Sequence, residues 1–219
     1  MPSTASAPLV DFSHKTRTVK EILESGPERS AAGKKEALTS KDAAANDAAA
    51  LEPAGKKSGV RLPLQVQHQE QTNWCWSAVS VSVSHYYNQS SPWTQCTLVS
   101  AELGAACCEN GSSSVCNVAW YLNLALQRTG NLDSYLSTKV PYPRVVGAID
   151  KRRPMCALTN WASGGGHFLA IVGYQTVEGI AYLYLSDPWY GDSLVAYDVF
   201  CTNYQGLGGT WTYSYFTES

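Results

Sequence analysis

Apolar and polar residues form short alternating runs along the last third of the chain, and these runs predict β-strands. Each run is bounded by turn-forming residues and is rich in β-branched or aromatic side chains. The predicted strands span residues 155–161, 167–174, 180–186, 194–199 and 210–217. Their short spacing is typical of an antiparallel sheet.

The region before these strands carries apolar residues at helical spacing. A short helix is predicted over residues 97–103, and a second around Val145, Val146 and Ile149, before Lys151. A longer helix is predicted to begin at an Asn117 cap, with its apolar face formed by Val118, Tyr121, Leu122, Ala125 and Leu126. Helices followed by antiparallel strands indicate an α+β fold.

The segment from Val79 to Ser84 is ambiguous. Valine and serine alternate there with a period of two, and both are weak helix formers. The pattern taken alone therefore predicts a strand.

The first 60 residues differ in composition from the rest. They carry 9 basic and 8 acidic side chains but a single aromatic residue, Phe12, whereas residues 61–219 hold all 7 Trp, all 13 Tyr and all 7 Cys. Such a segment buries too little apolar surface to offset its ordering entropy. We predict a disordered tail over residues 1–60 and a folded domain over residues 61–219. A short helical pattern at Thr18–Ser25 predicts a transient helix, or else a helix that binds a partner or serves as a secretion signal.

Charge and hydropathy exclude several classes of protein. The net charge is −2, with no basic stripe to neutralise phosphates, which argues against a nucleic-acid partner. The longest apolar run, Phe168–Tyr174, is far shorter than the about 20 residues that span a bilayer. No apolar stretch of the length found in secretory signals follows the N-terminus. We expect a monomer without membrane insertion and without a cofactor.

Four of the seven cysteines lie in a short loop region rich in Gly and Ser. A zinc site would need short-spaced pairs, which the intervals here do not provide, so disulfides are the better interpretation and no metal is expected. Six cysteines allow 15 pairings, and the sequence does not choose among them. The candidates for pairing are Cys96, Cys107, Cys108, Cys116, Cys156 and Cys201.

Cys75 is left over, and its surroundings favour a nucleophile. It lies between Trp74 and Trp76, apart from the cysteine-rich loop, and a reactive thiol needs a cation beside it. His167 follows a run of three glycines at the start of a predicted strand, and Asp187 ends the next strand. Adjacent strands would place Asp187 beside His167, where it would orient the imidazole. Taken singly, each residue also fits a structural role: an inert buried thiol, a core histidine and a turn former.

The order of these residues resembles the papain-like cysteine peptidases. Gln69 stands six residues before the pair Cys75 and Trp76, a Gly-rich loop precedes His167, and Asp187 is followed closely by Trp189 and Gly191. The resemblance covers roughly residues 62–217 and is closest to the bacterial group that includes the AvrRpt2-type effector proteases. It departs from papain in having Asp187 in place of an asparagine and in the cysteine-rich insert at 96–116.

The resemblance implies a two-lobed fold and a set of roles. Cys75 would be the nucleophile, His167 the general base and then acid, and Asp187 the orienting carboxylate. Gln69, with the backbone N–H of Cys75, would stabilise the oxyanion, although Gln67 and Gln71 lie within reach in the sequence. The nucleophile would lie on a helical lobe and the other two residues on a sheet lobe, with the active site in the cleft between them.

The same resemblance decides two further expectations. It implies a helix at Cys75, and we adopt that helix over the strand pattern, with Ala78, Val81 and His85 facing inward. We expect the neighbours of the triad to contact the substrate, namely Trp76, Gly165, Gly166 and Trp189.

The predicted function is hydrolysis of a protein or peptide substrate through an acyl-enzyme. An acyl transferase, deamidase or transglutaminase with the same triad, and a non-catalytic disulfide-braced binding module, remain alternatives. Disulfides without a recognisable signal predict an exported or secreted bacterial protease or effector, with residues 1–60 as secretion signal, pro-segment or both, contacting secretion machinery or a chaperone.

Overall fold

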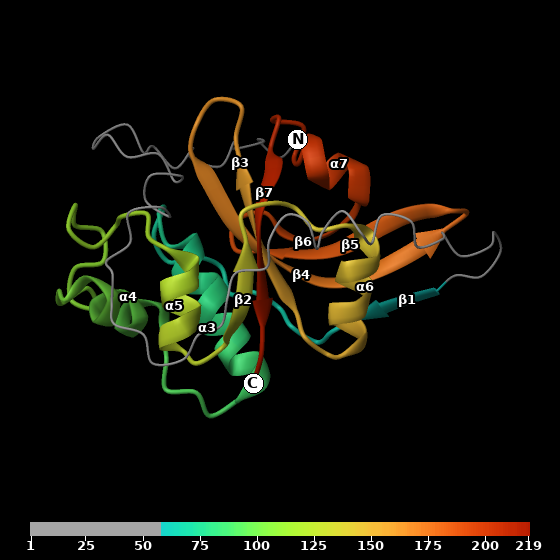
Figure 1. The fold of residues 1–219 in the computed structure, drawn as a ribbon. Helices are drawn as coiled ribbons and strands as arrows, with labels where there is room; N and C mark the ends of the chain where they lie inside the picture. The colour runs from blue at the N-terminus through green and yellow to red at the C-terminus, as the bar shows by residue number, and fades with distance from the viewer. Residues whose placement is uncertain (1–57) are drawn as a thin grey trace, which may run out of the picture.

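A seven-stranded antiparallel sheet forms one half of the molecule in the computed structural model, which describes residues 58–219 (Figure 1). The strand order is β2-β7-β3-β4-β5-β6, and β1 pairs with the far half of β4. The strands are β1 (Ser58–Arg61), β2 (Leu132–Leu136), β3 (Met155–Asn160), β4 (Gly166–Val177), β5 (Ile180–Asp187), β6 (Gly191–Ala196) and β7 (Thr210–Thr217).

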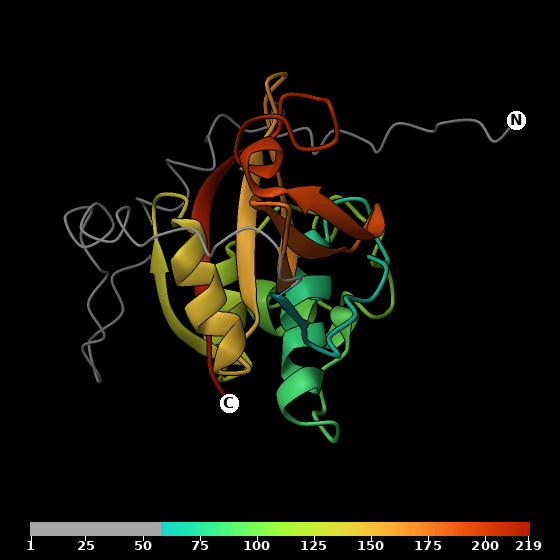
Figure 2. The same ribbon diagram turned by 90° about the vertical axis from the view of Figure 1, so that its right-hand side faces the viewer.

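Three helices gather into a separate lobe, and two others cover the opposite face of the sheet. Figures 1 and 2 show α3, α4 and α5 together on one side, with α6 on the other. The helices are α3 (Cys75–Tyr87), α4 (Gln95–Leu103), α5 (Leu122–Arg128), α6 (Tyr142–Asp150) and α7 (Tyr197–Thr202). This arrangement agrees with the predicted α+β, two-lobed fold.

The apolar core is divided by the sheet into two clusters. One joins the helical lobe to the face of β3 and β4 that carries Cys156, Leu158 and Phe168. The other lies under α6 and α7 and includes Met155 and Ala157. Alternate residues of β3 therefore enter different cores, as expected for a strand buried on both faces.

The ambiguous Val–Ser segment is helical, as the resemblance implied. Every residue of α3 from Cys75 to Ser84 is buried, so this part of the helix has no solvent-exposed face. The alternation of valine and serine therefore does not indicate a strand here. Two of the buried serines are satisfied within the helix, because Ser80 Oγ donates to Trp76 O and Ser82 Oγ to Ala78 O. The expected inward stripe was too narrow, and His85 is only half-buried, with Nε2 at 2.9 Å from Trp93 O.

Most predicted elements are present in the structure, but two of them differ in extent. The helix predicted over 97–103 begins at Gln95, where Thr94 and Thr97 form a capping box. The helix predicted from Asn117 begins only at Leu122, because Asn117 is bonded elsewhere. The strand predicted over 194–199 ends at Ala196 and continues as α7. The short strands β1 and β2 were not predicted.

Trp211, Tyr213 and Tyr215 alternate along β7 and would share one face of a regular strand, but they lie on both faces. Trp211 belongs to the core under α7, whereas Tyr213 and Tyr215 belong to the core of the helical lobe. The register on β3 shifts between Leu158 and Thr159, and this bulge reverses the alternation.

The folded domain begins earlier than predicted. β1 starts at Ser58, three residues before the expected boundary at 61, and residues 58–61 pair with β4 from Gly173 to Thr176. The remainder of the predicted tail, including Thr18–Ser25, lies outside the described residues. Within residues 58–219, no helix has both the length and the hydropathy needed to cross a bilayer.

Candidate active site

His167 and Asp187 meet at the end of the sheet nearest the helical lobe. His167 is the second residue of β4 and Asp187 the last of β5, and these strands are antiparallel neighbours. The imidazole Nε2–H donates to Asp187 Oδ1 at 2.9 Å, and both side chains are buried. The contact expected from the sequence is therefore present.

Four donors surround the Asp187 carboxylate. Besides His167, Oδ1 accepts from the backbone N–H groups of Trp189 at 2.7 Å and Tyr190 at 2.8 Å. The other oxygen, Oδ2, accepts from the Tyr204 hydroxyl at 2.9 Å. Burial alone would raise the pKa of Asp187, but the positive charge of His167 and these hydrogen bonds outweigh it and hold the pKa below its usual value.

The same pairing shifts His167 in the opposite direction. Burial lowers its pKa, but the charge and hydrogen bond of Asp187 and a further hydrogen bond with Cys75 raise the pKa to about 10. The imidazole is therefore protonated at neutral pH and forms an ion pair with Asp187.

Cys75 approaches His167 from the helical lobe. It is the first residue of α3, where the backbone N–H groups have no acceptor within the helix and the helix dipole favours negative charge. Its thiol lies close enough to His167 to contribute to the raised pKa of the imidazole. Cys75 is 3% exposed and His167 5% exposed, so only a small part of each meets solvent. The structure thus brings Cys75, His167 and Asp187 into one continuous chain of contacts.

Residues 62–71, which we call the strap, connect β1 to the nucleophile segment and touch both lobes. On the sheet side, Val66 N–H donates to Ser186 Oγ at 2.9 Å and Gln69 N–H to Pro188 O at 3.0 Å. On the helical side, Gln67 N–H donates to Ser82 Oγ at 2.9 Å. The strap therefore fixes the helical lobe relative to the turn that follows Asp187.

Gln69 lies in this strap, buried, six residues before Cys75. Its Nε2 donates to the carbonyl oxygens of Gln71 at 2.9 Å and Thr72 at 2.8 Å, which engages both amide hydrogens within the loop. Its Oε1 is buried, with no hydrogen-bond partner among the described residues. To act as the predicted oxyanion donor, Gln69 would have to release one of these carbonyl groups.

Gln95, a residue that the sequence analysis missed, holds the strap on both sides of Gln69. Its Oε1 accepts from Glu70 N–H at 2.9 Å, and its Nε2 donates to His68 O at 2.9 Å. Its own carbonyl accepts from the Ser77 hydroxyl of α3 at 3.0 Å. Gln95 therefore ties the Gln69 backbone to the nucleophile helix.

The four predicted substrate contacts differ in their surroundings. Trp76 is fully buried and donates its indole N–H to Val118 O at 3.1 Å, so it is a core residue and cannot contact substrate. Gly166 is buried in β4, where a Cβ would lie 2.8 Å from Leu158 Cδ1. Gly165 and Trp189 are partly exposed, and the Trp189 ring faces that of His68 at 5.6 Å.

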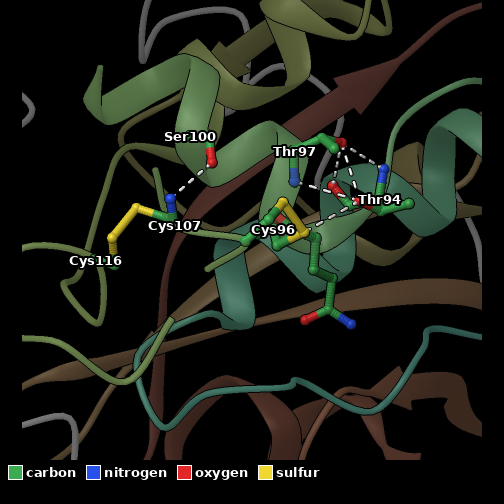
Figure 3. The surroundings of a disulfide bond; sticks show 9 residues. Thr94, Cys96, Thr97, Ser100, Cys107 and Cys116 are labelled. Carbon is green, nitrogen blue, oxygen red and sulfur yellow. Dashed lines mark hydrogen bonds between the residues drawn. A yellow bond between two sulfur atoms is a disulfide. The ribbon is translucent and has the colours of Figure 1, made fainter. Parts of the chain in front are cut away.

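The cysteine-rich loop contains two disulfides, Cys96–Cys108 and Cys107–Cys116. Figure 3 shows the second of them next to α4, where Cys107 N–H donates to Ser100 Oγ at 3.0 Å. The expectation of disulfides rather than zinc is confirmed for these four residues. The first disulfide joins the adjacent Cys108 to the start of α4.

With the other four candidates paired among themselves, a third disulfide would have to join Cys156 to Cys201. That disulfide is absent. Both are free, buried thiols, as is Cys75. Cys156 belongs to the core of the helical lobe and Cys201 to the core under α7. Because the sheet lies between these cores, the two cannot meet. Burial raises the pKa of both thiols, which keeps them protonated.

The segment from Cys116 to Val118 binds the residues around the nucleophile. Asn117 Oδ1 accepts from Asn73 N–H at 2.9 Å, and Asn117 O accepts from Asn73 Nδ2 at 2.8 Å. Asn117 Nδ2 also donates to Thr72 Oγ1 at 2.9 Å. The indole of Trp74 donates to Cys116 O at 2.8 Å. The cysteine-rich insert therefore supports the segment that leads into Cys75.

A cavity of about 600 Å³ lies elsewhere, between β7, α7 and the loop after β2. Its lining includes Tyr135, Lys139, Trp211 and Cys201 but no member of the triad. It is not part of the candidate active site.

Comparisons with known proteins give one family model and several solved structures that are similar to this chain. The family model described as papain-like cysteine protease AvrRpt2 matches residues 56–205. Among solved structures, a chain from a study of the mite allergens Blo t 1 and Der p 1 is similar with a TM-score of 0.52 at 12% identity, over 84% of this chain and 75% of that one. Digestive procathepsin L 3 of Tenebrio molitor larval midgut is similar with a TM-score of 0.47 at 14% identity, over 76% of this chain and 71% of that one. No curated protein matches by sequence.

Proposed function

The chain belongs to the family of the papain-like cysteine protease AvrRpt2, so it is a cysteine peptidase, and we propose that Cys75, His167 and Asp187 are its catalytic triad. The observation that carries this proposal is the continuous contact from Cys75 through His167 to a fully bonded Asp187. A histidine with only a structural role would not need the buried Asp187 carboxylate beside it. An unreactive thiol would not need the positively charged imidazole of His167.

In the proposed reaction, an imidazolium beside the thiol stabilises the Cys75 thiolate. The thiolate attacks the carbonyl carbon of the scissile peptide, and the carbonyl π electrons move to the oxygen. His167 then gives its proton to the leaving amine as the C–N bond breaks, which leaves a thioester on Cys75. A water molecule, deprotonated by His167, attacks the thioester and releases the carboxylic acid and the thiolate.

Oxyanion stabilisation is assigned to the start of α3 and the strap. The backbone N–H of Cys75 has no acceptor within the helix and lies next to the reacting sulfur. The Gln69 amide joins it by exchanging one of its two loop carbonyls for the oxyanion, since catalytic hydrogen bonds commonly form fully only with substrate bound.

The two disulfides support a site of action outside the reducing cytosol, as an exported protease. A free Cys75 and paired loop cysteines coexist because Cys75 has no other thiol in bonding position. For the route of export, and for residues 1–60 as secretion signal, pro-segment or both, the sequence predictions stand as proposals.

The function is tested with a peptide library, and its products are identified by mass spectrometry. Wild type is expected to give new peptide termini. The variants Cys75→Ala and His167→Ala are expected to give none, while the control Cys201→Ala, which changes a free thiol outside the triad, cleaves as wild type does. Products linked to an added amine without free acid would indicate acyl transfer. Equal behaviour of wild type and Cys75→Ala would contradict the triad.

A further inference from the structure

Tyr204 is the one side-chain hydroxyl that the described residues place on the Asp187 carboxylate. It lies in the turn between α7 and β7, 17 residues after Asp187 in the sequence, and its side chain is fully buried. Its phenol O–H donates to Oδ2 at 2.9 Å, on the oxygen that does not face His167. No sequence motif pointed to this residue.

The turn holds Tyr204 in place by its backbone. Tyr204 N–H donates to Gly209 O at 2.9 Å, and Leu207 N–H to Tyr204 O at 3.3 Å. Gly206 and Gly208 have φ of 69°, a conformation that other residues rarely adopt. A Cβ at Gly209 would lie 2.7 Å from the Trp161 ring, so glycine also permits the close approach of that ring.

The Tyr204 ring is fixed by neighbouring aromatic side chains. It is stacked on Trp161 at 6.2 Å between centroids, and Trp161 is stacked on the His167 imidazole at the same distance. Tyr190 contacts both His167 and Tyr204 edge-on. The phenol is thus held in a rigid cluster that also limits the movement of the imidazole.

We propose that Tyr204 is a positioning residue for the triad, which fixes Oδ2 of Asp187 and thereby keeps Oδ1 directed at His167. This inference rests on the proposed function, because it assigns Tyr204 a part in the same site. A carboxylate with one oxygen bound can still rotate about its Cβ–Cγ bond. With both oxygens bound, its plane is set, and so is the direction of the hydrogen bond to the imidazole.

The proposal has a consequence for the pH dependence of the triad. A donor to the charged carboxylate stabilises it, so removal of the phenol O–H raises the pKa of Asp187. Once Asp187 is protonated, His167 loses its counter-charge and the thiolate is no longer favoured. The acid limb of the activity therefore moves to higher pH, while activity well above that limb changes less.

The other titratable groups around Asp187 do not replace Tyr204. His167 on β4 and Cys75 on α3 belong to the triad. Tyr190 reaches Asp187 through its backbone N–H. Asp192 on β6 accepts from Ser186, and His68 on the strap contacts Trp189. Only Tyr204 among these side chains is bonded to Oδ2.

The test compares Tyr204→Phe with Tyr184→Phe. The first removes the hydroxyl on Oδ2 and keeps the ring, whereas the second removes a hydroxyl on the same strand as Asp187 that donates to Gln175 and not to the carboxylate. For Tyr204→Phe we expect kcat/KM to fall about tenfold near its optimum through kcat, with KM little changed. The acid limb is expected to move up by about one pH unit. Tyr184→Phe is expected to keep the wild-type profile.

Two further measurements keep the outcome decisive. NMR titration of the His167 ring reports on the pair with Asp187 whether or not the protein cleaves peptides, so failure of the proposed function is distinguished from failure of this inference. If Tyr204→Phe does not fold, fluorotyrosine at position 204, a stronger donor, is expected to move the acid limb to lower pH. Superimposable titrations and profiles for wild type and the altered protein would overturn the proposal.

Discussion

Asn117 and Asn73 are joined by two hydrogen bonds that link the cysteine-rich loop to the residue two positions before the nucleophile. The amide oxygen and the backbone carbonyl of Asn117 accept from the backbone and the side chain of Asn73. Because Cys75 begins a helix immediately after this contact, the pair fixes where α3 starts. The insert that distinguishes this chain from papain thus acts on the nucleophile segment itself.

The first prediction concerns Asn117. We expect Asn117→Ala to lower kcat/KM about tenfold, because the two side-chain hydrogen bonds of Asn117, with Asn73 and Thr72, are lost. Asn117→Asp keeps the acceptor for Asn73 and is expected to lose less. Steady-state kinetics on a cleaved peptide measure both. The control is Asn110→Ala in the same loop, and an equal loss in that variant would show that only general loop stability matters.

The second prediction separates the two disulfides. Replacing Cys107 and Cys116 by serine is expected to reduce activity more than the same change at Cys96 and Cys108, since Cys116 adjoins Asn117 and accepts from Trp74. Each pair is expected to contribute about 2–4 kcal/mol to the free energy of unfolding. Urea denaturation and kinetics on both variants measure the two effects. A larger activity loss for the Cys96–Cys108 pair would contradict this account.

The third prediction concerns the charge of Asp187. His167 has its pKa raised from 6.5 to about 10 by this carboxylate. Asp187→Asn keeps an acceptor oxygen but removes the charge, so the pKa of His167 falls and the alkaline limb of kcat/KM moves to lower pH by more than one unit. The pH–rate profile measures this shift. Asp192→Asn, which leaves the His167 contact intact, is expected to keep the wild-type limb.

Stability follows from the same shift with a defined sign. A raised pKa in the folded protein stabilises it fully below the unfolded value of 6.5, and this contribution is lost as the pH rises through about 10. The free energy of unfolding of wild type is therefore expected to decline between pH 6.5 and 10 more steeply than that of Asp187→Asn. Parallel declines would show that the ion pair does not exist in solution.

The fourth prediction concerns Gln69. If its amide reaches the oxyanion, Gln69→Ala is expected to lower kcat by about 10²–10³ with little change in KM. Gln95→Leu, which frees the strap around Gln69 without touching substrate, is expected to give a smaller loss. Rapid-quench kinetics of acylation measure both variants. Unchanged acylation in Gln69→Ala would leave the oxyanion to the backbone alone.

The sequence sufficed for much of the site because its residues lie in distinctive local settings. His167 follows three glycines and Asp187 ends an apolar strand, and adjacent strands bring such positions together. The sequence could not supply contacts between segments without a local signal. Tyr204, Gln95 and Asn117 are ordinary residues whose partners are set by tertiary packing. The sequence of α3 predicted a strand for a related reason. A helix that is buried on all sides has no polar face, so its sequence lacks the 3.6-residue period by which a helix is recognised.

The cysteine prediction was wrong for two of its six candidates, Cys156 and Cys201, for a reason of topology. Counting cysteines treats all six as available, but Cys156 and Cys201 lie on opposite faces of one sheet. The two short disulfides lie within a single loop and the start of α4, where pairing requires no long-range contact. Three free thiols therefore remain, and their chemical difference tests the site.

The expected difference in reactivity between Cys75 and the other two free thiols gives the most direct test of an activated nucleophile at Cys75. Unreduced protein is treated with an epoxide inhibitor of papain-like enzymes, and the labelled residues are identified by peptide mass spectrometry. The account predicts one adduct, on Cys75, with both disulfides intact and Cys156 and Cys201 unlabelled, and no adduct in His167→Ala. A folded wild-type protein that is unlabelled at Cys75, or labelled equally at its three free thiols, would contradict an activated nucleophile at this site.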